Sequence, residues 1–114
     1  MARFDYDLAV IGSGDAGSEA AFLANEAGLS VAVIECDKWG GSSLNYSDIP
    51  MGALTYVSHL LHETKKAAKL GLSSNALRYN YPTVNNWKNF AMKRAGADDE
   101  SVYTEDKITC YNGQ

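Results

Sequence analysis

Cysteine, proline and long apolar runs are all scarce in this sequence. The two cysteines, Cys36 and Cys110, are too few and too far apart to predict a disulfide framework or a metal-binding knuckle, so we expect two isolated buried thiols. No apolar stretch is long enough to span a bilayer, and the N-terminus has no basic segment followed by an apolar run and a cleavage site. We therefore expect a cytoplasmic protein that does not bind a membrane.

Basic residues are also in the minority. Ten lysines and arginines face 14 acidic residues, which gives a formal net charge of -4 and no general attraction to nucleic acid. The hydrophobic fraction of 46% and the charged fraction of 21% are typical of an ordinary globular protein. A length of 114 residues makes one small domain, which is large enough for a core but small for a complete dinucleotide-binding enzyme.

The first 36 residues have the pattern of a βαβ unit. Residues 7–11 (DLAVI) form a short apolar run that ends at a glycine, which predicts a strand buried on both faces at the centre of a parallel sheet. An alanine-rich helix should follow to about Ala27, closed by Gly28, and residues 30–35 (SVAVIE) should form the second strand. We place the βαβ unit at residues 5–36.

The turn between the first strand and the helix reads Gly12-Ser13-Gly14-Asp15-Ala16-Gly17, which is a dinucleotide-binding fingerprint. The first glycine permits a tight turn, the second clears space for a pyrophosphate, and the third lets helix and strand pack closely. Free N–H groups and the helix dipole then face the anion, while Glu35 at the end of the second strand can accept hydrogen bonds from the ribose hydroxyls. The candidate cofactor-binding residues of this unit are Gly12, Gly14, Asp15, Ala16, Gly17, Glu35 and Cys36.

The fingerprint by itself leaves alternatives open. FAD and NAD both present an adenosine and a pyrophosphate to such a turn, and a glycine turn that binds nothing is the simplest alternative. The carboxylate of Glu35 should repel a 2'-phosphate, so NADP is disfavoured at this site.

The next segment distinguishes between the two cofactors. It reads Gly40-Gly41-Ser42-Ser43-Leu44-Asn45, with Ile49-Pro50 close behind, and together with residues 6–12 (YDLAVIG) it resembles the FAD domain of the pyridine nucleotide-disulfide oxidoreductases. That family includes dihydrolipoyl dehydrogenase, glutathione reductase and mercuric reductase. The resemblance extends over residues 5 to 54, including Ala53 and Leu54. It implies FAD at the fingerprint, the run from Gly40 to Ser43 along the path to the flavin, and a separate NAD(P)H domain in the intact fold.

Three departures from the family pattern fall on the residues that carry its chemistry. Ser43 and Asp48 stand at the two redox-cysteine positions, and Gly52 stands where the family has a lysine near the flavin. Neither a hydroxyl nor a carboxylate can relay electrons as a thiolate and a disulfide do, which argues against disulfide reductase activity. Transfer from a flavin directly to a quinone, oxygen, a metal or another nicotinamide stays open. In such a protein, we hypothesise, Asp48 disfavours the anionic reduced flavin.

A helical excursion should occupy residues 40–96. One helix is expected after Pro50, with Leu54, Val57, Leu60 or Leu61, Ala67 or Ala68 and Leu70 on its apolar side and Gly71 at its end. His59, His62 and Glu63 on this helix could be metal ligands, but a solvated stripe is the more common role of such a set, and we expect no metal. Residues 72–82, with Asn75, Asn80 and Pro82, should form a loop. Its Tyr79 and Tyr81 should pack on the surface of the core, and covering a helix rather than meeting a ligand is the alternative for them.

A second helix should run from about Thr83 to Gly96, with Trp87, Phe90, Ala91 and Ala95 on its buried side. The acidic segment 98–106 reads as a loop or a ragged helix, and residues 107–111 (KITCY) as a third parallel strand. The expected fold is therefore α/β, Rossmann-like, with a parallel sheet, a GxGxxG βαβ unit and a helical excursion before the third strand. We expect it to be incomplete, with residues 1–114 forming the N-terminal portion of an FAD-binding domain.

Two functions are consistent with these patterns. In the first, the chain is the FAD-binding part of a flavin-dependent, NAD(P)H-linked oxidoreductase, and the chain by itself is inactive. In the second, it is a stand-alone nucleotide-binding or interaction module that associates through its open sheet edge with another protein or as a homodimer.

Overall fold

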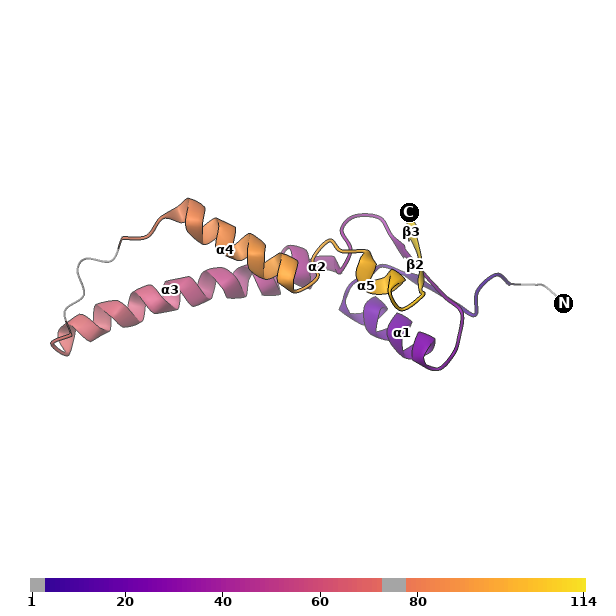
Figure 1. Ribbon diagram of the computed structural model, residues 1–114, viewed down its shortest axis with the longest axis horizontal. Helices are drawn as coiled ribbons and strands as arrows, with labels where there is room; N and C mark the ends of the chain where they lie inside the picture. Colours follow the sequence, from indigo (N-terminus) through magenta and orange to yellow (C-terminus); the bar gives the residue numbers. More distant parts are fainter. Residues whose placement is uncertain (1–3, 73–77) are drawn as a thin grey trace.

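The computed structural model describes residues 4–72 and 78–114, and it begins with the expected βαβ unit (Figure 1). Strand β1 (Leu8–Ile11), helix α1 (Asp15–Glu26) and strand β2 (Val31–Glu35) follow one another, and the two strands pair in parallel with Leu8 opposite Val31. The turn after β1 needs a glycine because Gly12 has a φ of 93°. The amide of Gly12 donates to the carbonyl of Ile34 (2.7 Å), which fixes the turn against the end of β2.

The third strand, β3 (Thr109–Asn112), pairs in parallel with β2, so the strand order is β1-β2-β3. These elements confirm an α/β fold with a parallel sheet and a helical excursion before the third strand. The expectation that the first strand is central and buried on both faces is wrong. Within the described residues β2 is central, and Ile11 in β1 is 90% exposed because α1 covers only the opposite face of the sheet.

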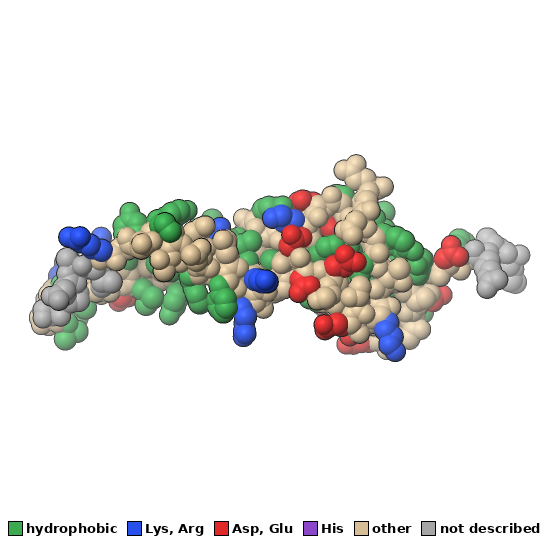
Figure 2. Space-filling model, turned by 45° about the horizontal axis from the view of Figure 1, so that its top comes forward, with side chains coloured by type: hydrophobic (Ala, Val, Ile, Leu, Met, Phe, Trp, Pro, Cys, Tyr) green, Lys and Arg blue, Asp and Glu red, His purple; other side chains and the backbone are tan. Residues whose placement is uncertain are grey.

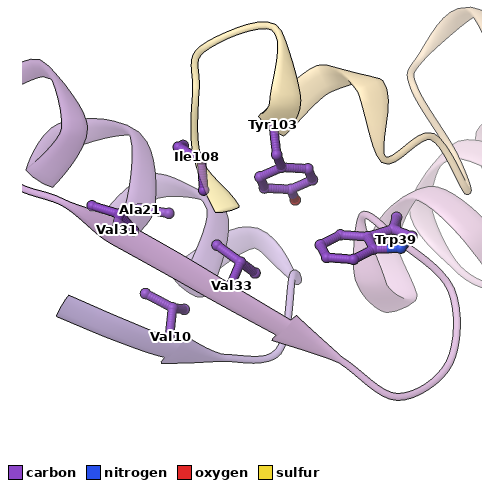
Figure 3. Close-up of a cluster of buried hydrophobic side chains, with 7 residues drawn as sticks. All are labelled: Val10, Ala21, Val31, Val33, Trp39, Tyr103 and Ile108. Carbon is purple, nitrogen blue, oxygen red and sulfur yellow. The ribbon is translucent and has the colours of Figure 1, made fainter. Parts of the chain in front are cut away.

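The hydrophobic core lies between the face of the sheet that α1 covers and the segments that pack on this face (Figure 3). Its buried side chains are Val10, Ala21, Val31, Val33, Trp39, Tyr103 and Ile108. The Tyr103 ring stacks on Phe22 of α1 at 5.3 Å between centroids and lies 5.2 Å from the Trp39 ring. Tyr103 belongs to a short helix, α5 (Ser101–Thr104). Its ring thus packs between α1 and the segment that follows β2.

Three further helices lie in the described part of the excursion, namely α2 (Gly41–Asn45), α3 (Asp48–Lys69) and α4 (Tyr81–Arg94). Helices α3 and α4 pack on each other and project from the sheet as an arm, which we define as residues 48–72 and 78–97 (Figure 1). The radius of gyration is 20.4 Å, compared with about 13 Å for a compact domain of this length. No helix among residues 4–72 and 78–114 is long and apolar enough to cross a bilayer.

Side chains of the arm are more exposed than the sequence analysis predicted. Helix α4 buries no residue, and its Trp87 and Phe90 are 42% and 56% exposed, because nothing in the described chain covers their side of the arm. Tyr79 and Tyr81 were expected on the surface of the core; they are 71% and 62% exposed and line a hollow together with Leu54, Val57 and Leu61 of α3. Asn75 lies outside the described residues.

Candidate cofactor site

The glycine turn has the two kinds of surface that a dinucleotide needs. A side chain at Gly12 or Gly14 would meet no atom within 4 Å, so both residues face open space. At Gly17 a Cβ would lie 2.0 Å from the Gly12 carbonyl oxygen, which shows how closely α1 approaches the turn. The amide groups of the first turn of α1, including those of Asp15 and Ala16, lie at the positive end of the helix dipole. The turn is therefore open on one side and tightly packed on the other.

The structure brings the second glycine pair to the same place. Gly40 and Gly41 adopt positive φ angles of 87° and 66°, and a Cβ on Gly41 would lie 2.5 Å from Gly14 Cα. Asn45 is buried and donates its side-chain amide to the carbonyls of Trp39 and Gly41, both at 2.9 Å. Two segments that are distant in sequence thus form one surface, with Ser42 exposed on α2.

Glu35 lies at the end of β2 with its carboxylate directed to the turn. One oxygen, Oε2, accepts hydrogen bonds from the Ser13 amide (2.8 Å) and hydroxyl (2.5 Å), and Oε1 accepts from the amides of Cys36 (2.8 Å) and Asp37 (3.0 Å). Burial acts to raise the pKa of Glu35, but the hydrogen bonds from Ser13, Asp37 and Cys36 outweigh it and lower the pKa to about 2. A ribose hydroxyl that reaches Oε2 must replace the Ser13 hydroxyl or share the oxygen with it.

Ser13 and Tyr103 are the residues of this site that the sequence analysis missed. Ser13 is fully buried; its hydroxyl accepts from the Gly40 amide (3.0 Å), and its carbonyl accepts from the hydroxyls of Tyr103 (3.0 Å) and Ser18 (2.8 Å). The position of Ser13 between two fingerprint glycines was a usable signal for its role. Nothing in the acidic segment around Tyr103 marked that residue, because its polar contacts lie 85 to 90 positions away in sequence.

Ser43 and Asp48, which the resemblance aligns with redox cysteines, lie in different surroundings. The Ser43 hydroxyl donates to Asp15 Oδ2 at 2.5 Å, which links α2 to the first turn of α1. Asp48 is exposed in the first turn of α3. The Asp15 amide can face an anion at this turn, but the Asp15 carboxylate adds a negative charge beside it.

The two cysteines lie apart from each other. Cys36 is exposed rather than buried, since it lies just beyond the carboxyl end of β2, and Cys110 is partly buried; both are free thiols. Cys110 lies opposite Val33, so Cys36 is displaced by about 10 Å along the strand direction. This separation is too large for a disulfide without movement of the backbone.

The residues considered as metal ligands form no cluster. Glu63 makes an ion pair with Lys66 at 2.9 Å on the surface of α3. Among residues 4–72 and 78–114, no three histidine, cysteine, aspartate or glutamate side chains are grouped so that they could hold a metal ion.

Comparison with known proteins shows the family of the chain. The sequence profile of the FAD binding domain matches residues 7–70, which include the glycine turn, Glu35 and the second glycine pair. The chain belongs to the FAD binding domain family. The dihydrolipoyl dehydrogenase of Buchnera aphidicola is 34% identical over 107 residues, which are 93% of this chain and 23% of the relative. That of Mycobacterium leprae is 43% identical over 72 residues, which are 62% of this chain and 15% of the relative.

This FAD binding domain chain therefore spans about a quarter of the length of the curated relatives that match most of it. The matched region is the N-terminal part of those relatives. The surface of the site fits the adenosine diphosphate half of FAD in three respects: the open space at Gly12 and Gly14, the amides of the first turn of α1, and an acidic acceptor at Glu35. The Asp15 carboxylate is the one feature that opposes a pyrophosphate.

Proposed function

We propose that this chain binds FAD and forms the flavin-binding part of an oxidoreductase that resembles dihydrolipoyl dehydrogenase but has no dithiol relay. The observation that supports the proposal is that the glycines of the site have different surroundings. Gly12 and Gly14 face open space, whereas Gly17 and Gly41 are held against backbone. A glycine turn with a structural role only would need the close contacts and not the open space.

Each candidate residue has a role in this proposal. The amides after Gly14 receive the pyrophosphate, Glu35 accepts the ribose hydroxyls, and the run from Gly40 to Ser43 lies along the path to the flavin. The flavin supplies the redox chemistry, and the chain positions the cofactor. With its pKa at about 2, Glu35 is ionised at neutral pH and acts as an acceptor only.

The absence of a dithiol relay rests on the residues at the two redox-cysteine positions. Ser43 donates to a carboxylate and Asp48 is exposed in the first turn of α3, and neither side chain has a sulfur atom. In the proposed parent protein, a bound flavin would supply redox chemistry between NAD(P)H and an acceptor such as a quinone, oxygen, a metal or another nicotinamide, without a dithiol of this chain between them. We expect the chain by itself to be inactive.

Two glycine variants test the cofactor site. Gly14 has a φ of -72°, which alanine also adopts, and a Cβ there would fill only the open space, so Gly14→Ala should leave the fold intact. Gly52→Ala is the matched control, because Gly52 lies within α3 and a Cβ there also meets nothing within 4 Å. Calorimetric titration with FAD should give an affinity at least about tenfold weaker for Gly14→Ala than for the wild type, while Gly52→Ala binds as the wild type does. Equal FAD binding by all three proteins would refute this placement of the pyrophosphate.

The second candidate function is a non-catalytic interaction module. It is favoured by the exposed face of the sheet around Ile11 and by the exposed aromatic side chains of the arm. A purified chain that has no flavin absorption and no measurable affinity for FAD or ADP would support this function over the first.

A further inference from the structure

The acceptor positions of the Glu35 carboxylate are all occupied by groups of the chain itself. Its two oxygens accept four hydrogen bonds, which come from the amides of Ser13, Cys36 and Asp37 and from the Ser13 hydroxyl. An ionised carboxylate offers about four lone-pair positions, so each position has a donor. A ribose hydroxyl that binds Glu35 therefore needs one of the four donors to give way.

Three of these donors are backbone amides in fixed positions. The backbone of Ser13 is held through its carbonyl, which accepts from the hydroxyls of Tyr103 (3.0 Å) and Ser18 (2.8 Å). The amides of Cys36 and Asp37 come directly after β2. An amide leaves the carboxylate only when the backbone moves, whereas the Ser13 hydroxyl leaves by rotation about a single side-chain bond. The hydroxyl is thus the donor that gives way at the least cost.

The Ser13 hydroxyl also lies close to the surface proposed for the nucleotide. It is fully buried, donates to Glu35 Oε2 at 2.5 Å and accepts from the Gly40 amide at 3.0 Å. The neighbours of Ser13 in sequence, Gly12 and Gly14, face open space. A hydroxyl of the chain therefore makes the same kind of hydrogen bond to Glu35 that a ribose hydroxyl would make.

Acidic residues surround this site more generally. Residues 1–47 and 98–114 hold 12 of the 14 acidic residues and three of the ten basic ones. Figure 2 shows most of the red side chains on this part of the molecule, outside the arm. Such a charge distribution gives a diphosphate no general attraction. The affinity for a nucleotide must then come from local hydrogen bonds, including those to the ribose.

We propose that Ser13 is a positioning residue whose hydroxyl substitutes for a ribose hydroxyl on Glu35, so that the site tolerates a deoxyribose. This inference rests on the proposed function, in which Glu35 accepts the ribose hydroxyls. A site built to bind a hydroxyl rejects the analogue that lacks it, because a buried polar group then loses its partner. Here Ser13 remains as that partner when the ribose hydroxyl is missing. The ribose hydroxyl gains only the difference between two similar hydrogen bonds.

Calorimetric titration with ADP and with dideoxy-ADP, which lacks both ribose hydroxyls, tests this role. For the wild type we expect the two dissociation constants to differ by less than about threefold. Ser13→Ala removes the substitute hydroxyl, so a ribose hydroxyl gains a complete hydrogen bond and the ratio should rise to at least about tenfold. The Gly40 amide also loses its acceptor in this variant, but that loss is common to both complexes and cancels in the ratio.

Two further variants separate this role from a structural one. Ser18→Ala removes a hydroxyl that contacts the Ser13 carbonyl and the Tyr103 hydroxyl rather than Glu35, so the ratio should stay as in the wild type. Ser13→Gly removes the same hydroxyl as Ser13→Ala and should give the same high ratio. It keeps the test decisive if the alanine variant does not fold.

The outcomes distinguish this inference from the proposed function. The inference alone is overturned if ADP binds but the wild type already prefers it at least tenfold, or if the ratio is equal in the wild type and the Ser13 variants. A rise in the ratio for Ser18→Ala as large as that for Ser13→Ala would overturn it as well. A wild type that binds neither ADP nor FAD would refute the proposed function, and this inference with it.

Discussion

The Glu35→Gln substitution should reveal how strongly the glycine turn is fixed to the end of β2. The carboxylate accepts four hydrogen bonds and is only 8% exposed, and its pKa falls from an ordinary 4.5 to about 2. At about 1.4 kcal/mol for each pKa unit, this shift corresponds to at most about 3.5 kcal/mol of the free energy of unfolding. A glutamine has no charge and must present its amide group to one pair of donors, so we expect a loss of about 2–3 kcal/mol at pH 7.

The loss of stability caused by Glu35→Gln should depend on pH. Because the folded-state pKa is lowered, the stabilisation is fully present above pH 4.5 and is lost as the pH falls toward 2. Urea unfolding of the two proteins should therefore show a difference that shrinks by more than half between pH 7 and pH 3. Glu26→Gln, at an exposed position of α1, should change stability by less than about 0.5 kcal/mol. A difference below about 0.5 kcal/mol for Glu35→Gln at pH 7, or one that stays constant with pH, would refute the reasoning.

Three other substitutions test separate parts of the site. Gly17→Ala places a Cβ 2.0 Å from a backbone oxygen of the glycine turn. It should lower the free energy of unfolding by more than about 2 kcal/mol in urea titrations. A near-neutral effect would contradict the close packing of α1 on the turn. Asp15→Asn removes the negative charge at the first turn of α1 and should tighten FAD binding about two- to fivefold in calorimetry; weaker binding would place the pyrophosphate elsewhere. Tyr103→Phe removes the hydroxyl that donates to the Ser13 carbonyl and pairs with the Ser18 hydroxyl, while the Ser18–Ser13 hydrogen bond stays. It should cost about 1–2 kcal/mol of the free energy of unfolding, compared with less than about 0.5 kcal/mol for the exposed Tyr111→Phe.

The sequence could predict the parts of the fold whose signal is local. The spacing of Gly12, Gly14 and Gly17 after an apolar run located β1, α1 and β2, since each glycine has a steric reason that can be stated without the rest of the chain. Gly28 has a φ of 84° and follows α1 closely, as a helix-ending glycine should. The second glycine pair could be placed at the same surface because its motif resembles that of a known family.

The parts that the sequence could not predict depend on distant partners. The apolar period of Trp87 and Phe90 identifies one side of a helix, but it does not say whether anything covers that side, and in the described chain nothing does. Strand order depends on which strand β3 pairs with, so the central place of β2 could not be deduced from the apolar run of β1. Tyr103 gave no periodic signal, because its burial is decided by Phe22 and Trp39, which are distant in sequence.

The most direct test of the cofactor assignment is calorimetric titration of the 114-residue chain with FAD at neutral pH, followed by its visible spectrum. We predict saturable binding of one FAD per chain, flavin absorption bands that stay with the protein through gel filtration, and competition by ADP for the same site. A chain that gives no heat with FAD, remains colourless after gel filtration and shows no affinity for ADP would contradict the account.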